Sequence, residues 1–156
     1  MQQLNIEDFL GDEIPDGWKS ACISIHSHWL TENEASNHWM TFVSLSGEND
    51  PNWNDYLFAE KSFVQLFQTL HQEYGLSIIK QNINGRELKL EHGTIDESTI
   101  RNIREEQFDA FHSEKLNCVV LGNFDFTFPI YIPEGQDWGI IQEIVGDSGL
   151  YVLHQP

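Results

Sequence analysis

Every second residue is apolar along segment 124–132, and this alternation is the feature that most constrains the fold. Phe124, Phe126, Phe128, Ile130 and Ile132 are separated by Asp, Thr, Pro and Tyr. Since successive side chains of a β-strand point to opposite faces, the pattern predicts a strand with one face in a hydrophobic core. Such a strand requires neighbours in a sheet and a second layer that covers its apolar face.

This strand is expected to belong to a hairpin. Residues 116–121 form an apolar run that ends at Gly122-Asn123, and the alternating segment follows directly. Gly at the first turn position fits a two-residue type II′ turn. Pro129 has no N–H to donate to a ladder, so we expect one edge of the strand to be free at that point.

A second hairpin is predicted around Asn84-Gly85. This pair fits a type I′ turn, which needs positive φ at both central residues. The strands would be 76–83 and 86–91, and the register places Ile79 opposite Leu90.

Three main amphipathic helices are predicted, over about Glu60–Tyr74, Glu97–Phe111 and Asp137–Val145, after a short helical start at Ile6–Leu10. The first has a continuous apolar stripe and a left-handed stop at Gly75. The stripe consists of Phe63, Leu66, Phe67, Leu70 and Tyr74. The second helix is capped by Thr94 and buries Ile100, Ile103, Phe108 and Phe111.

Further strands are expected over Ser20–Leu30, about His38–Ser44 and Leu150–Leu153. The order is then strand, strand, helix three times, followed by a strand. Adjacent antiparallel strands with helices packed on them make an α+β fold. No candidate linker divides the chain, so residues 1–156 are expected to form a single acidic α+β domain built on a mainly antiparallel sheet of successive hairpins.

The charge of the chain restricts its partners. It has 25 acidic and 8 basic residues, a formal net charge of −17. Residues 1–60 hold eleven acids and one base, 61–115 nine acids and seven bases, and 116–156 five acids and no base. Because phosphate binding needs Lys or Arg, we expect neither nucleic acid nor a membrane as partner. A net magnitude of about 2–8 usually keeps a small domain soluble, so the excess favours a basic protein partner.

The segment 47–56 is the predicted contact surface for that partner. It is expected to be a loop, because Gly, Pro, Asn and Asp dominate it. Trp53 lies in it among Glu48, Asp50 and Asp55. Tryptophan is enriched at binding hot spots, and the carboxylates would attract Lys or Arg. The alternative is that Trp53 folds back onto the core.

Three histidines are the only candidate metal ligands. His26 and His28 would share one face of the predicted strand 20–30, and His38 would come from the next strand. Three imidazoles with an open position suit zinc, so a metal-dependent enzyme at this trio is an alternative function. Histidines on a solvated strand face are the simpler interpretation, and we expect no metal and no cofactor.

One motif is similar to a catalytic segment. Gly146-Asp147-Ser148-Gly149 is the sequence found around the nucleophile of chymotrypsin-like serine proteases, which need two β-barrels and a preceding His and Asp. This chain is too short for two barrels, and its pattern here predicts helix, turn and strand. No catalytic residue is therefore expected, and a non-enzymatic role is favoured.

These observations predict an acidic protein-binding module that neutralises or caps a basic protein. The chain is similar in character to immunity proteins, which inhibit a toxin; charge and size carry that likeness. A second alternative is an acidic dimeric secretion chaperone.

The first residues lack the basic and apolar regions of a secretory signal, so a cytoplasmic address is expected. Cys22 and Cys118 lie in apolar runs and are expected to be reduced, buried thiols.

Overall fold

The computed structural model describes residues 4–38, 41–79, 82–83, 86–87, 94–123 and 126–154. Within these ranges six antiparallel strands form one sheet in the order β2-β5-β6-β7-β1-β8, and a separate pair is formed by β3 and β4. The strands are β1 Trp18–Ser24, β2 Ser77–Ile78, β3 Asn82–Ile83, β4 Arg86–Glu87, β5 Ala110–Ser113, β6 Cys118–Leu121, β7 Thr127–Pro133 and β8 Tyr151–His154.

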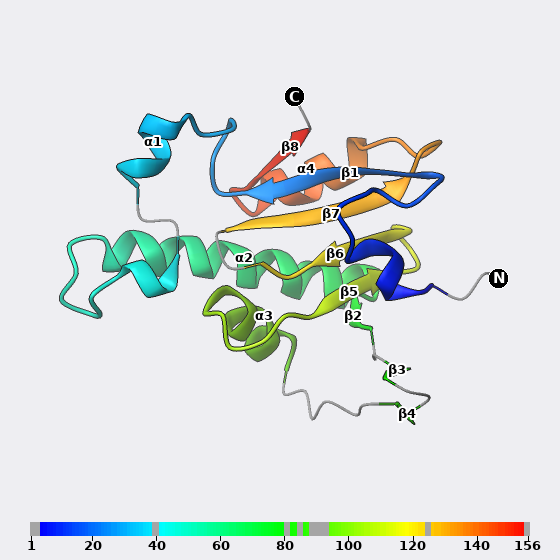
Figure 1. The fold of residues 1–156 in the computed structure, drawn as a ribbon, viewed down its shortest axis with the longest axis horizontal. Coiled ribbons are helices and arrows are strands. Elements are labelled where there is room, and N and C mark those ends of the chain that lie inside the picture. Colours follow the sequence, from blue (N-terminus) through cyan, green and yellow to red (C-terminus); the bar gives the residue numbers. More distant parts are fainter. Residues whose placement is uncertain are drawn as a thin grey trace.

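Helices cover one face of this sheet. Figure 1 shows the long α2 and the shorter α4 behind the strands, α3 below them, and the 3₁₀ helix η1 in front. The predicted α+β fold is therefore confirmed. The helices are α1 Glu32–Ser36, α2 Trp53–Tyr74, α3 Ile95–Ile103 and α4 Gly139–Asp147, with 3₁₀ helices η1 Ile6–Phe9 and η2 Phe42–Ser44.

The apolar stripe of α2 forms the centre of the core. Phe63 and Phe67 both contact Phe128 of β7, with ring centroids 4.8 and 5.7 Å apart, and Phe67 also meets Phe111 of β5 at 4.8 Å. Gly75 ends the helix with φ of 65°, as predicted. The helix begins at Trp53, seven residues before the predicted start, so the predicted loop 47–56 is a loop only as far as Asn52.

The predicted alternation is confirmed over β7, whereas Phe126 lies before the strand with φ of 57° and Phe124 lies outside the described residues. The predicted turn before the strand is wrong. Phe128, Ile130 and Ile132 are buried, and the residues between them are half-buried. The ladder joins Val120 to Ile130, so the connection from β6 is longer than two residues. Gly122 has no positive φ, which a type II′ turn would require at that position. Pro129 pairs with β1, and the described pairs with β6 lie at Ile130 and Tyr131.

Gly122 is needed for a different reason, a close approach to Asn102 at the end of α3. A Cβ on Gly122 would lie 2.0 Å from Asn102 Oδ1. That oxygen accepts the Asp109 N–H at 2.7 Å, and the Asn102 amide donates to Ser98 O and to Asp109 Oδ2. Asn102 is fully buried and its amide is held from both ends, so it cannot move aside cheaply.

The tip of the Asn84-Gly85 hairpin has the predicted register. Ile83 pairs with Arg86 and Asn82 with Glu87, which leaves two residues between β3 and β4. The turn itself and Leu90 lie outside the described residues. At the base of the hairpin, β2 pairs with β5 of the main sheet, and Ile79 donates its N–H to Ala110 O at 2.8 Å.

Two predictions in the N-terminal half are wrong. The strand 20–30 ends at Ser24, whose hydroxyl accepts the His26 N–H at 3.1 Å and turns the chain. The strand 38–44 is replaced, in its described part, by η2, because Phe42 packs onto the start of α2. Between them Thr31 and Glu34 form a capping box that starts α1, a helix that the sequence did not predict.

The helix predicted over 97–111 is too long. Thr94 caps it and Ile103 is buried in the core, as expected. The helix ends at Ile103, and two residues later Glu105 takes a left-handed φ of 63°, which turns the chain away from the helix axis. Phe111 enters the core from β5, and Phe108 is 58% exposed.

The opposite face of the sheet is partly covered by η1. Phe9 packs edge-on against Trp18 of β1 and Tyr131 of β7, with centroids 5.1 and 5.2 Å apart. Cys22 and Cys118 are both buried, as predicted, and burial raises the pKa of Cys118 to about 12.

Gly122→Ala should destabilise the fold by about 1–3 kcal/mol, the usual range for an overpacked interior. Gly146→Ala is the matched control: Gly146 lies inside α4 with open space where a methyl group would go, so the change should stabilise by about 0.5–1 kcal/mol. Urea unfolding of both variants measures the difference. Equal stabilities would contradict the close approach of Gly122 and Asn102.

Candidate partner-binding surfaces

Asp50 organises the loop that precedes α2. Its carboxylate accepts the Asn52 N–H at 2.8 Å, the Ser46 N–H at 3.0 Å and the Ser46 hydroxyl at 3.2 Å. These hydrogen bonds lower the pKa of Asp50, and the bond from the Asn52 N–H has the largest effect. Of the four predicted contact residues, Asp50 is thus engaged with its own loop, whereas Glu48 and Asp55 are exposed.

Trp53 belongs to an aromatic cluster at the N-terminus of α2. Its indole stacks on Tyr56 at 5.6 Å with an interplanar angle of 24°, and Phe42 of η2 lies 6.2 Å away. The side chain is half-buried and packs against the core. Trp53 therefore folds back onto the core and keeps one part of its surface open to solvent. Asp55 lies beside it in the first turn of α2, where the helix dipole favours a negative charge.

A buried ion pair lies beneath this cluster and was not predicted from the sequence. Arg104, which caps α3, donates from Nε and Nη2 to the two carboxylate oxygens of Glu60, both at 2.9 Å. Tyr56 donates its hydroxyl to the same carboxylate at 2.5 Å, and the guanidinium lies over the Phe42 ring at 5.1 Å. Burial and the bond to Glu60 raise the pKa of Tyr56, and the Glu60 bond raises that of Arg104. A buried charge at Glu60 is tolerated because these two partners occupy its oxygens.

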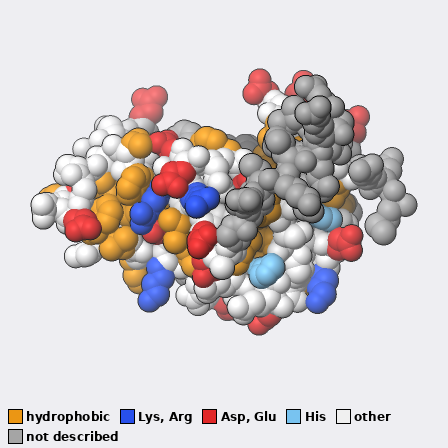
Figure 2. Space-filling view, turned by 90° about the horizontal axis from the view of Figure 1, so that it is seen from below, with side chains coloured by type: hydrophobic (Ala, Val, Ile, Leu, Met, Phe, Trp, Pro, Cys, Tyr) orange, Lys and Arg blue, Asp and Glu red, His pale blue; other side chains and the backbone are white. Residues whose placement is uncertain are grey.

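The side of the molecule that carries α3 is not uniformly acidic. Figure 2 views this side and shows Lys and Arg beside Asp and Glu, with hydrophobic side chains between them. This mixture agrees with the near balance of acids and bases in residues 61–115. The excess negative charge therefore belongs to the surfaces formed by residues 1–60 and 116–156.

The three histidines lie after β1 and not on a strand face. The ring of His26 meets that of His38 edge-on at 4.7 Å, and His28 Nε2 lies 2.8 Å from Glu34 Oε2. Burial, and then the nearby His38 and His28, lower the pKa of His26, while Glu34 acts in the opposite direction. No group of three or more His, Cys, Asp or Glu side chains among the described residues is arranged to hold a metal ion.

The Gly146–Gly149 motif forms the predicted junction of helix, turn and strand. Ser148 is the C-cap of α4, is buried, and donates its N–H to Val145 O. Gly149 takes φ of 78° and leads into β8. A buried serine at a helix end is explained by this turn.

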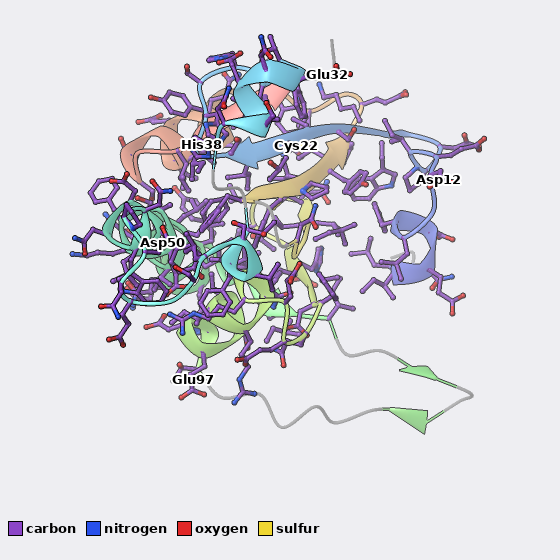
Figure 3. All side chains as sticks on the ribbon, turned by 60° about the vertical axis from the view of Figure 1, so that its left-hand side comes forward. Asp12, Cys22, Glu32, His38, Asp50 and Glu97 are labelled. Atoms are coloured by element: carbon purple, nitrogen blue, oxygen red, sulfur yellow. The ribbon has the colours of Figure 1, made fainter. Side chains whose placement is uncertain are left out.

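A groove on the η1 side of the sheet was not predicted. It has a volume of about 1100 Å³ and lies between the segment Leu4–Trp18 and the β5–β6 connection. Its lining includes the carboxylates of Asp8, Glu13, Asp16 and Glu114. Figure 3 shows Asp12 of this segment and Asp50 of the α2 loop at opposite ends of the molecule, so the two acidic surfaces are separate.

The Glu60–Arg104 pair gives a test of this architecture. Arg104→Met leaves Glu60 buried without its cation, which costs about 3–5 kcal/mol for a fully buried pair. The Arg104 side chain keeps 29% exposure, so we expect roughly 2–4 kcal/mol, measured by urea unfolding. Arg101→Met is the control, because its contact with Glu106 is 3.9 Å long and exposed and should contribute below about 1 kcal/mol. Equal losses of unfolding free energy in the two variants would contradict the presence of a buried ion pair between Glu60 and Arg104.

The His26–His38 contact predicts a pH dependence. Because folding lowers the pKa of His26 below its ordinary 6.5, the unfolded chain binds this proton more readily. The associated stability is complete above pH 6.5 and is lost as the pH falls towards the lower, folded value. In His38→Gln the pKa of His26 should rise, as followed by NMR titration of its ring protons. His112, whose pKa is lowered mainly by burial, should keep its midpoint in the same spectra. An unshifted His26 would show that the two rings are apart.

Comparison with known proteins adds no family to these observations. No protein-family model, no curated protein and no solved structure matches this chain. Among the described residues, no helix combines the length and the apolar character that crossing a bilayer requires. The functional argument therefore depends on the surfaces described above.

Proposed function

We propose that this chain is an acidic protein-binding module that captures and neutralises a basic protein, as immunity proteins do with a toxin. The carrying observation is that Glu48 and Asp55, which flank Trp53 in the sequence, are both exposed, while the half-buried Trp53 indole packs on Tyr56 and Phe42. A fixed aromatic surface with flanking carboxylates is suited to a partner's Lys or Arg side chain.

The neighbouring cations support this proposal. Arg104 is the cation that contacts the aromatic cluster, and both of its hydrogen-bonding arms are occupied by Glu60. Lys19, the one base among residues 1–60, lies over the Trp138 ring at 5.9 Å. Within the described part of the chain, Glu48 and Asp55 form no ion pair, which leaves their charge to act on an approaching partner.

Asp50 is a contact residue of a different kind. Its three hydrogen bonds hold the loop, so replacing it changes the shape of the surface as well as its charge. We propose that Asp50 positions Glu48 and Trp53, while Glu48 and Asp55 steer the partner. A charge-reversal test should therefore leave Asp50 in place.

The test uses the partner that the chain captures from an extract of its own source cells, after purification. Glu48→Lys with Asp55→Lys should slow association about tenfold at low ionic strength and flatten its salt dependence, because rim charges act mainly on encounter. Glu143→Lys with Asp147→Lys is the control, an equal charge change at two exposed residues of α4. Stopped-flow fluorescence measures both rates.

Trp53→Ala separates the anchor from the steering charges. It should accelerate dissociation and cost about 2 kcal/mol of binding if the indole is a hot spot. Because Trp53 also packs on Tyr56, each variant's unfolding midpoint is measured alongside. Captured proteins that are not basic, or an association rate changed equally by the α4 control, would make the proposal wrong.

A further inference from the structure

We propose that the groove between η1 and the β5–β6 connection binds an extended basic segment of the partner protein. The inference rests on the proposed function and adds to it a second contact, distinct from the α2 loop. Three features carry it: a firmly built wall, a lining in which the described charged side chains at neutral pH are carboxylates, and apolar surface between those carboxylates.

The wall of the groove is held in place by packing and by a tight turn. Phe9 is buried between Trp18 and Tyr131, which fixes η1 on the sheet. The chain then turns at Pro15–Trp18, where Trp18 donates its N–H to Pro15 O at 3.1 Å. Gly17 takes φ of 81° in this turn, a value that type II turns require at their third residue. Glu134 donates its N–H to Gly17 O at 2.9 Å and ties the turn to the end of β7.

Among the described residues that line the groove, the charged side chains are acidic. Asp8, Glu13 and Asp16 lie along one wall, and Glu114 lies on the other. Lys115, next to Glu114, donates to Glu73 O at the end of α2, at 3.3 Å. Burial lowers the pKa of His112, which also lines the groove, so that imidazole is neutral at pH 7. Fixed carboxylates on both walls produce a field that selects a cationic occupant.

Apolar surface lies between the charges. Ile14 is 45% exposed at the groove, and Leu4, Pro15 and Trp18 also line it. An alternation of acid and apolar groups complements a chain of Lys or Arg with aliphatic residues, whose stems lie on apolar surface while their heads reach carboxylates.

A polypeptide fits this groove better than a second copy of the chain or a small amine. A second copy carries the same charge of −17 and would be repelled. The volume of about 1100 Å³ lies at the upper end of the roughly 300–1,000 Å³ of small-molecule pockets, and the acidic residues that line the groove come from two segments far apart in the chain. A segment of several residues can meet all of them at once.

The test measures binding of a labelled dodecapeptide in which Arg alternates with Val, by fluorescence anisotropy at low salt. We expect binding by the wild type and about tenfold weaker binding by Glu13→Gln with Glu114→Gln, given the usual contribution of exposed ion pairs. Glu143→Gln with Asp147→Asn, at two exposed residues of α4, is the matched control and should change the affinity less than twofold. Glu48→Gln with Asp55→Asn is measured beside it to show whether the α2 loop takes the peptide instead. In ¹H–¹⁵N spectra the Trp18 indole signal should shift on titration, and the Trp53 signal should not.

Each contrary outcome has a defined meaning. If the peptide shifts Trp53 and responds to the Glu48 and Asp55 variant, the groove proposal is wrong and the proposed function stands. If spermidine displaces the peptide at equal concentration, the groove holds small amines and the proposal of a peptide site is overturned. If the Arg-Val peptide does not bind, or a Glu-Val peptide binds equally well, the groove has no such role, and the kinetics with the captured partner still decide the proposed function.

Discussion

The packing of α2 against β5 and β7 is the interaction on which the rest of the structure depends. Phe63 and Phe67 meet Phe128 and Phe111 at centroid separations of 4.8–5.7 Å. Such aromatic pairs contribute about 0.5–1.5 kcal/mol each beyond the area they bury. Because α2 occupies one face of the central strands, only the other face remains for the N-terminal segment. The position of the groove follows from this choice of face.

The sequence predicted those elements whose apolar residues repeat at a regular spacing. The stripe of α2 repeats at helical spacing and the apolar residues of β7 repeat at every second position, so both elements were recognised. The helix expected over 97–111 shows the limit of this reasoning. Phe111 continues the helical spacing of Ile100 and Ile103, yet it enters the same core from β5 after a left-handed turn at Glu105. A periodic pattern identifies the buried residues, but it does not show whether each of them lies on a helix or on a strand.

The groove could not be predicted, because its two walls are far apart in the sequence. Nothing local connects Glu13 with Glu114; the sheet brings them together by pairing β1 with β7 and β7 with β6. Only one wall has a local signal, the Pro15-Asp16-Gly17 turn with its acids. The predicted surface at Glu48–Asp55 is local and could be recognised, although Trp53 proved to lie on a helix and Asp50 to serve the loop.

The two acidic surfaces differ in how the fold sustains their charge. At the α2 loop, two of the carboxylates have local stabilisation: Asp50 accepts loop N–H groups, and Asp55 lies in the favourable helix dipole. In the groove, the carboxylates are held near one another by apolar packing of Phe9 and by the Gly17 turn. Their mutual repulsion is opposed by that packing and by salt, which screens exposed charges over about 8 Å at physiological ionic strength. A bound cation would remove the repulsion directly, and any ligand that binds only the folded chain also stabilises it. The proposed binding of a basic segment in the groove would therefore also stabilise the folded N-terminal segment.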